Sequence, residues 1–172
     1  TPADAMKDPN LRSAAADSSA AQAAAEAQAT PSSPAGELSI GDPNPGLRLA
    51  KFVKGDEVTA PLKDDVTVVE FWATWCGPCQ VEMPHLQRLH EELKDDGLVV
   101  LAISVDEART ASRVKPHIKS KGFTFPVLLD TSTEVVTQYN PQKTLPYSVL
   151  VDRRGNIQWR HNGYSPGDEA EI

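Results

Sequence analysis

Apolar side chains show two kinds of spacing in the middle of the chain, continuous runs and a helical repeat. Residues 65–72 (DVTVVEFW) and 98–106 (LVVLAISVD) are nearly continuous apolar runs rich in β-branched side chains, which predicts two buried strands. Between them, residues 77–95 carry apolar side chains near a 3.6-residue spacing and stop before Gly97, which predicts a helix. A strand, a helix and a second strand in this order predict a parallel unit.

Further elements follow toward the C-terminus. They are expected as a helix over residues 108–121 with a break at Pro116, a short strand over 125–130, a helix over 131–139, and a β-hairpin over 147–161 that turns at Arg154-Gly155-Asn156. Strands and helices in this order indicate an α/β fold, a sandwich whose mixed central sheet is parallel in the middle and antiparallel at one edge.

The first 36 residues have a different composition. They contain 13 alanines, and no Val, Ile, Leu, Met, Phe, Trp or Tyr lies between residues 12 and 37. Alanine favours helix, so a stable helix docked on the domain is one interpretation. Because small side chains bury too little surface to offset the entropy of ordering, we expect residues 1–36 to be a flexible tether rich in Ala, Ser and Pro. Residues 37–172 are then a single domain.

Composition and charge argue against several classes of function. The 172 residues carry a formal net charge of −7, which argues against a nucleic-acid partner or a polybasic membrane surface. No apolar run approaches the roughly 20 residues that a transmembrane helix needs. The chain begins at Thr1 without a basic and apolar leader, so we expect a processed or truncated product whose signal or anchor segment is missing.

Both cysteines lie in one motif, Trp75-Cys76-Gly77-Pro78-Cys79, at the junction of a predicted strand and helix. This spacing places the two thiols in the first helical turn, close enough to form a disulfide. The first thiol lies at the helix N-terminus, where unpaired N–H groups and the helix dipole favour a thiolate. We therefore expect Cys76 to be the nucleophile and Cys79 to be the resolving thiol of a redox disulfide.

Three other interpretations of the cysteines compete with redox chemistry. A purely structural disulfide would close so short a ring that it would stabilise the fold little. A zinc site with His85 and His90 would have a loop far shorter than the ~12 residues of a zinc finger, so we expect no metal. A pair of inert buried thiols would leave the strand–loop–helix context unexplained.

The segment VVEFWATWCGPC (residues 68–79) resembles the active-site strand and loop of thioredoxin-fold proteins. Leu145-Pro146 resembles the cis-proline that precedes a strand in that family, and Pro84 matches a proline of its active-site helix. The resemblance covers about residues 38–165. It implies a thioredoxin-like three-layer sandwich.

Finer features resemble the TlpA/ResA type of thiol–disulfide oxidoreductase. They are an N-terminal hairpin expected over residues 41–62, the Trp72–Trp75 segment, Glu82 followed by Met83-Pro84, and an inserted helix and strand over residues 108–130. This resemblance implies an extracytoplasmic protein, formerly tethered to a membrane, that acts in cytochrome c maturation or thiol maintenance. The implied partners of the protein are protein thiols and disulfides and a membrane or extracytoplasmic electron donor. The protein is expected to need no cofactor and to work as a monomer.

Two glutamates complete the expected catalytic set. The position of Glu70 resembles that of the buried acid that accepts a proton in thioredoxin. This resemblance implies that Glu70 is a general base for Cys79, and burial should raise its pKa. Its alternative is an exposed carboxylate at a strand edge. Glu82 matches a family acid that tunes the thiol pKa or contacts the partner. Its alternative is an ordinary solvated glutamate.

The resemblance also implies a substrate-binding set around the motif: Trp75, Gly77, Pro78, Leu145 and Pro146. Gly77-Pro78 resembles the reducing loop of thioredoxin, and a cis Pro146 would leave the preceding backbone free to pair with a substrate strand. The alternative for Pro146 is a trans proline that begins a strand. We expect the four histidines (His85, His90, His117 and His161) to be surface or packing residues.

The leading functional hypothesis is therefore an enzyme, a thiol–disulfide oxidoreductase that reduces its targets. The alternatives are a thioredoxin-fold adaptor that only binds a partner, and a disulfide oxidase or isomerase of the same fold. A peroxidase of the related peroxiredoxin class is disfavoured, because both cysteines are used by the CxxC motif. Residues 168–170 begin a C-terminal helix that we expect to be short or truncated.

Overall fold

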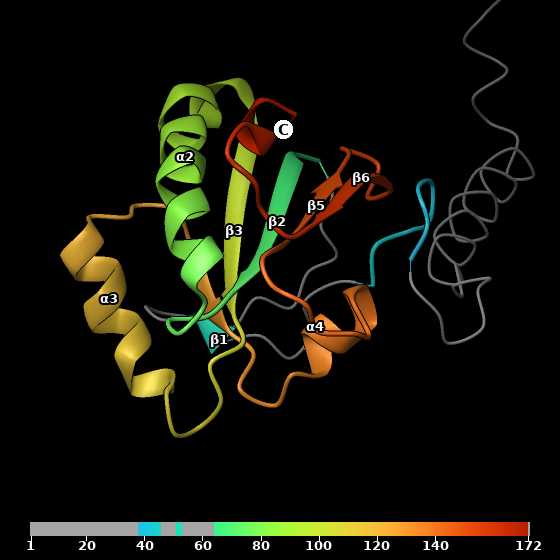
Figure 1. The fold of residues 1–172 in the computed structure, drawn as a ribbon. Coiled ribbons are helices and arrows are strands. Elements are labelled where there is room, and N and C mark those ends of the chain that lie inside the picture. Colours follow the sequence, from blue (N-terminus) through green and yellow to red (C-terminus); the bar gives the residue numbers. More distant parts are fainter. Residues whose placement is uncertain (1–37, 46–50, 53–63, 172) are drawn as a thin grey trace, which may run out of the picture. The chain divides into compact units, whose positions relative to one another are not determined.

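The computed structural model describes residues 38–45, 51–52 and 64–171, all within one compact unit of the chain, Ser33–Ile172 (Figure 1). The tether expected over residues 1–36 lies outside the described residues. Within the described part, no helix combines the length and the apolar character that crossing a bilayer requires.

A six-stranded mixed sheet forms the centre of the described part, with strand order β1-β4-β3-β2-β5-β6 (Figure 1). Its strands are β1 (Lys51–Phe52), β2 (Val66–Trp72), β3 (Leu98–Ser104), β4 (Val127–Leu129), β5 (Tyr147–Val151) and β6 (Ile157–Asn162). The three central pairings include two parallel ones, β2 with β3 and β3 with β4, whereas β5 pairs with both β2 and β6 in antiparallel fashion. The predicted mixed sheet with an antiparallel edge is confirmed, and the structure has a second antiparallel pairing at the other edge, between β1 and β4.

Strand β2 lies in the interior of the sheet, between β3 and β5, and is buried from Thr67 onward. A strand covered on both faces needs apolar side chains on both, which explains the continuous rather than alternating pattern of its sequence. The β-branched run of β3 has the same cause. Both strands predicted from these runs are confirmed, with β3 ending two residues earlier than expected, at Ser104.

Helices cover both faces of the sheet. Helix α2 (Gly77–Leu93) brings Glu82 onto the face of Glu70, since both glutamates contact the same serine of β5. Phe71 points to the opposite face because side chains alternate along a strand. There its ring lies 5.3 Å from Tyr139 of α4 (Glu134–Tyr139). The three-layer arrangement expected for a thioredoxin-like sandwich is thus present.

Two short 3₁₀ turns follow longer elements, one after α2 and one after β6. The turn η2 (Lys94–Asp96) follows α2 and ends at Gly97, whose φ of +90° lies in the left-handed region that favours glycine. At the C-terminal side, the expected helical start is a single 3₁₀ turn, η4 (Asp168–Ala170).

The insertion between β3 and β5 contains a 3₁₀ turn η3 (Ala111–Arg113), helix α3 (Val114–Lys121) and strand β4. The break expected at Pro116 is wrong, because α3 begins at Val114 and continues through the proline. Pro116 lies in the first turn, where backbone N–H groups have no acceptor within the helix, so proline removes no hydrogen bond there. Strand β4 pairs with β3 on one side and β1 on the other. Most of the hairpin expected over residues 41–62 lies outside the described residues.

Candidate active site

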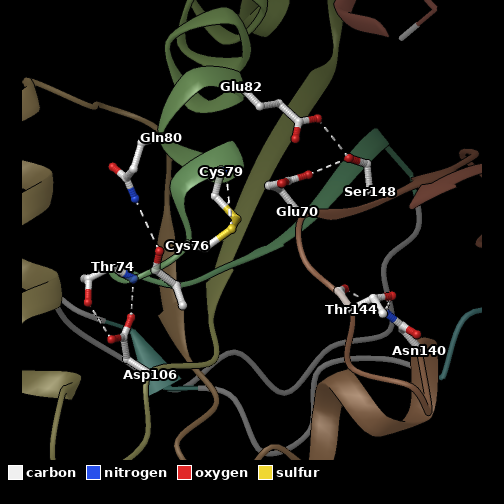
Figure 2. The surroundings of a disulfide bond; sticks show 11 residues. Glu70, Thr74, Cys76, Cys79, Gln80, Glu82, Asp106, Asn140, Thr144 and Ser148 are labelled. Atoms are coloured by element: carbon white, nitrogen blue, oxygen red, sulfur yellow. Dashed lines mark hydrogen bonds between the residues drawn. A yellow bond between two sulfur atoms is a disulfide. The ribbon is translucent and has the colours of Figure 1, made fainter. Parts of the chain in front are cut away.

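The two cysteines form a disulfide at the start of α2 (Figure 2). Cys76 is the N-cap of this helix, and its sulfur accepts a hydrogen bond from the backbone N–H of Cys79 at 3.3 Å. The Cα atoms of the two cysteines are 5.4 Å apart. The pair therefore occupies the first helical turn, where a backbone N–H group that has no acceptor within the helix donates to the first sulfur.

The two sulfurs differ in their access to solvent. Cys76 retains 6% of its surface, whereas Cys79 retains none. Around Cys76 the chain is open, because Trp75 is 61% exposed and Gly77 and Pro78 are exposed as well. A partner can therefore reach Cys76 but not Cys79, which is the asymmetry that distinguishes a nucleophile from a resolving thiol.

A buried carboxylate anchors the loop that leads into the motif. Asp106, just beyond β3, accepts hydrogen bonds from the Thr74 backbone N–H at 2.8 Å and the Thr74 hydroxyl at 2.6 Å. The hydroxyl of Ser104 donates to the same carboxylate at 2.8 Å. Figure 2 shows the two bonds from Thr74, and together with the bond from Ser104 they hold the loop against the end of the neighbouring strand.

The segment before β5 lies beside the end of β2, since Tyr147 pairs with Phe71 in the sheet. Its Leu145–Pro146 peptide bond is cis. The carbonyl oxygens on either side of Leu145 are engaged: Thr144 O accepts from Asn140 Nδ2 at 2.9 Å, and Pro146 O accepts from the N–H of Gly163 at 2.8 Å. These bonds hold the segment next to the point where β2 runs into the active-site loop.

Glu70 and Glu82 meet at a single hydroxyl in the interior (Figure 2). The Ser148 Oγ atom lies 2.5 Å from Oε2 of Glu70 and 3.2 Å from Oε1 of Glu82. All three side chains are buried. The solvated alternatives considered for Glu70 and for Glu82 are therefore wrong, because the sheet and α2 enclose both carboxylates.

Burial changes the acidity of both groups. It raises the pKa of Glu70 well above the usual value of 4.5, and the nearby Glu82 carboxylate raises it further, while the bond to Ser148 acts in the opposite direction. Burial likewise raises the pKa of Glu82, to about 6, against the lowering effect of its bonds to Ser148 and Glu70 and of the charge on His161. Both carboxyls are therefore easier to protonate than an exposed glutamate.

Three contributors to this arrangement escaped the sequence analysis. Ser148 is the polar residue inside the otherwise apolar strand Tyr147–Val151, and that local mismatch is the signal that could have drawn attention to it. His161 lies opposite Ser148 in the sheet, and its Nε2 is 3.0 Å from Oδ2 of Asp168. No sequence pattern links His161 or Asp168 to the cysteines, because the register between β5 and β6 places His161 and the fold of η4 brings Asp168 to it.

The zinc interpretation does not fit the described residues. Cys76 and Cys79 are bonded to each other, and His85 stacks on Tyr164 while His90 packs edge-on against Phe125. No group of three or more His, Cys, Asp or Glu side chains in the described ranges is arranged to hold a metal ion. The histidines of α2 are packing residues in this structure.

Comparison with known proteins identifies a family and relatives of this chain. A sequence model of the AhpC/TSA family matches residues 40–160. Sporulation thiol-disulfide oxidoreductase A of Bacillus subtilis (strain 168) is 30% identical over 115 residues, which are 66% of this chain and 69% of that protein. The thiol-disulfide oxidoreductase ResA of a Bacillus cereus strain is 35% identical over 110 residues, 64% of this chain and 62% of the relative.

Solved structures give the same picture of the fold. A protein assigned as the thiol:disulfide interchange protein DsbE, from Chlorobium tepidum, has a TM-score of 0.69 to this chain at 25% sequence identity, covering 78% of this chain and 93% of that one. Because the match spans nearly all of the solved protein, the likeness concerns a whole domain and not an isolated motif.

Proposed function

The chain belongs to the AhpC/TSA family, and from this premise we propose that its Cys76–Cys79 centre reduces disulfides of protein substrates by thiol–disulfide exchange. Its curated relatives are thiol-disulfide oxidoreductases, which is also the class of this domain. The direction of exchange, the substrates and the cellular setting belong to the proposal.

One observation carries the proposal: a disulfide at a helix N-terminus has one sulfur at the surface and the other in the core. The N–H of Cys79 and the helix dipole stabilise negative charge on the Cys76 sulfur once the disulfide is reduced. A stabilised thiolate attacks at neutral pH and is also a good leaving group. The buried Cys79 is protected from competing partners.

The reaction has two exchange steps. The Cys76 thiolate attacks one sulfur of a substrate disulfide, forms a mixed disulfide and releases the other substrate sulfur as a thiolate, which takes up a proton. Cys79 then loses its proton and attacks the Cys76 sulfur, which forms the Cys76–Cys79 disulfide and releases the second substrate thiolate. The substrate gains two electrons, and the protein is left oxidised. Glu70 is the proposed acceptor of the Cys79 proton, and Glu82 the proposed modulator of the centre.

The substrate segment is proposed to lie between two surfaces. Trp75, Gly77 and Pro78 are exposed on the helix side of the disulfide. Leu145 and Pro146 lie in the bend just before β5, which we propose borders the other side of the substrate and which is held in place by the bonds at Thr144 O and Pro146 O. Pairing of a substrate strand with this backbone is the mode of recognition that such an edge supports.

Insulin reduction in the presence of dithiothreitol tests the proposal. We expect the wild type to accelerate precipitation of the insulin B chain, Cys76→Ser to abolish the acceleration, and Cys79→Ser to accumulate covalent conjugates with the substrate, visible on non-reducing gels. Each variant replaces one sulfur atom by oxygen, so the two differ only in the cysteine that is changed. Acceleration by Cys76→Ser at the wild-type rate contradicts the proposal, and binding without turnover in the wild type identifies an adaptor.

The Gly77-Pro78 dipeptide supports a reducing rather than an oxidising centre, by its resemblance to the loop of thioredoxin. Equilibration of the protein with glutathione redox buffers, followed by alkylation, measures the reduction potential. A potential more reducing than glutathione fits a reductase. A strongly oxidising potential assigns the protein to disulfide oxidases or isomerases instead.

The resemblance to ResA-type proteins supports an extracytoplasmic setting, where a membrane or extracytoplasmic electron donor returns the centre to its reduced form. Cytochrome c maturation and thiol maintenance are the two tasks proposed for it there. Residues 1–36 are proposed as the tether that separates the domain from its anchor, and the domain is proposed to act as a monomer. Cell fractionation and sedimentation of the full chain test the location and the oligomeric state.

A further inference from the structure

Sheet register places three polar side chains in one row. Glu70 of β2 lies opposite Ser148 of β5, and Ser148 lies opposite His161 of β6. Directly opposite residues of antiparallel strands point to the same face. The row therefore runs across the sheet from the central strand to the edge strand, and Glu82 reaches it from α2, one helical turn beyond Cys79.

Hydrogen-bond stoichiometry restricts how many protons this row can hold. The Ser148 hydroxyl has one hydrogen to donate, yet two carboxyl groups lie within 3.2 Å of its oxygen. When it donates to one carboxylate, its lone pairs face the other, and a second ionised carboxylate there would be repelled. The favourable arrangement has one carboxylic acid that donates to Ser148, while Ser148 donates to the other carboxylate.

The remaining carboxyl oxygens point to the same conclusion. Glu70 Oε1 and Glu82 Oε2 are buried and have no hydrogen-bond partner among the described residues. Two ionised carboxylates with half of their oxygens unpaired would be costly in the core, where one shared proton removes half of the charge.

We propose that Glu70, Ser148 and Glu82 act as one acid that holds a single proton, with Ser148 as the positioning residue through which the proton passes between the two carboxyls. The inference rests on the proposed function, in which Cys79 must lose a proton. Carboxyl pairs that share one proton titrate as a unit and not as two separate groups.

The proton balance of the resolving step follows from this arrangement. Glu70 passes its proton to the Ser148 oxygen while the Ser148 hydrogen moves to Glu82, which leaves Glu70 ionised. Glu70 then accepts the proton of Cys79, and Glu82 releases one proton toward water. The pair holds one proton before and after the step, and Cys79 is left as the thiolate that attacks Cys76.

Other charged groups act on the outer end of the row. His161 of β6 lowers the pKa of Glu82, and Asp168 of η4, which is bonded to His161, raises it. His161 and Asp168 keep 28% and 26% of their side-chain surface, so these two neighbours of Glu82 are partly exposed to water. Burial raises the pKa of Glu70, which agrees with a proton resting on the pair.

Carbon-13 NMR of glutamate side-chain carboxyls tests the proposal on the oxidised protein. In the wild type we expect the carboxyl carbons of Glu70 and Glu82 to respond together in both of two titration steps, with one proton bound between them near neutral pH. In Glu82→Gln, Glu70 should titrate in a single step shifted to lower pH. Independent single-step curves in the wild type, or a Glu70 curve unchanged in Glu82→Gln, overturn the proposal.

Two variants of Ser148 distinguish the role of its hydroxyl group from the role of its side-chain packing. In Ser148→Ala we expect the two carboxyls to lose their common steps and the resolving step to slow about tenfold with an altered pH–rate profile. Ser148→Thr keeps the hydroxyl and should restore both properties. Equal effects of the two variants indicate a packing role and contradict the proposal. Because the NMR titration needs no turnover, absence of insulin reduction by the wild type would instead count against the proposed function.

Discussion

Two buried acidic sites flank the active-site loop, and they are satisfied to very different degrees. On one side the Asp106 carboxylate accepts three hydrogen bonds, two from Thr74 and one from Ser104. On the other side Glu70 and Glu82 share the one hydroxyl of Ser148, and one oxygen of each has no partner among the described residues.

This contrast separates a structural acid from a chemical one. A carboxylate whose oxygens accept several hydrogen bonds holds its donors in place. Carboxylates with too few donors are driven toward protonation, and a group that readily gains and loses a proton near neutral pH is suited to acid–base chemistry. We therefore expect changes at Asp106 to affect mainly stability, and changes at the glutamates to affect mainly the pH dependence.

The largest effect is expected from Asp106→Ala. The substitution leaves the backbone N–H and hydroxyl of Thr74 and the hydroxyl of Ser104 without their acceptor, which should lower the free energy of unfolding by about 4 kcal/mol. Urea denaturation of the oxidised protein measures this. The exposed neighbour provides the control, since Glu107→Ala should change stability by less than about 0.5 kcal/mol. A loss of that small size in Asp106→Ala would show that the Asp106 cluster is not an anchor.

Glu70→Gln should have the next largest effect, on rate. Glutamine keeps the shape but cannot accept the Cys79 proton, so the resolving step should slow about 100-fold at neutral pH while the first attack by Cys76 stays unchanged. Stopped-flow measurement with a fluorescent disulfide peptide separates the two steps. Glu92→Gln, an exposed change on the same helix as the disulfide, is the matched control. A wild-type pH–rate profile in Glu70→Gln removes Glu70 from the mechanism.

Thr74→Val tests one bond of the Asp106 anchor. It deletes the hydroxyl that donates to Asp106 at 2.6 Å but keeps the shape and the backbone N–H. A hydrogen bond to a charged acceptor contributes roughly 1.5–3 kcal/mol, so stability should fall by about 2 kcal/mol. Thr74→Ser retains the hydroxyl and should stay close to the wild type. Equal losses in the two variants would assign the effect to packing instead of the bond.

The smallest effect is expected from Glu82→Gln, and it has the opposite sign. The folded protein binds the Glu82 proton more tightly than the unfolded chain does, since the pKa is about 6 instead of 4.5. Stability of the wild type should therefore decrease as the pH rises through this interval. Glutamine removes this loss, so the variant should be more stable by at most about 2 kcal/mol at about pH 8 and gain nothing at about pH 4. A gain at both pH values would contradict the prediction.

Much of the fold could be predicted because its signals are local. The apolar runs of β2 and β3, the helical spacing of α2 and the hairpin of β5 and β6 each express burial or turn chemistry within a short segment. The failure at Pro116 has a local cause too, since the position of a helix start within the segment 108–121 decides whether proline breaks it. The η3 turn before α3 supplies that start.

The candidate site could be predicted only in part. The CxxC spacing identifies the disulfide, and resemblance points to Glu70 and Glu82 as separate acids. Their meeting at Ser148 could not be foreseen, because it depends on the register between β2 and β5 and on the reach of α2 across 66 residues of sequence.

Taken alone, the order of residues determined which chemical groups this protein has and which short segments become strand, helix or turn, because these depend on neighbours within a few positions. The three-dimensional arrangement decided which acid is an anchor and which pair has to share a hydrogen. That distinction depends on how many donors surround each carboxylate in the core. The donors of β3, β5 and the loop after β2 meet the carboxylates of β2, α2 and the segment after β3 only when the sheet has formed.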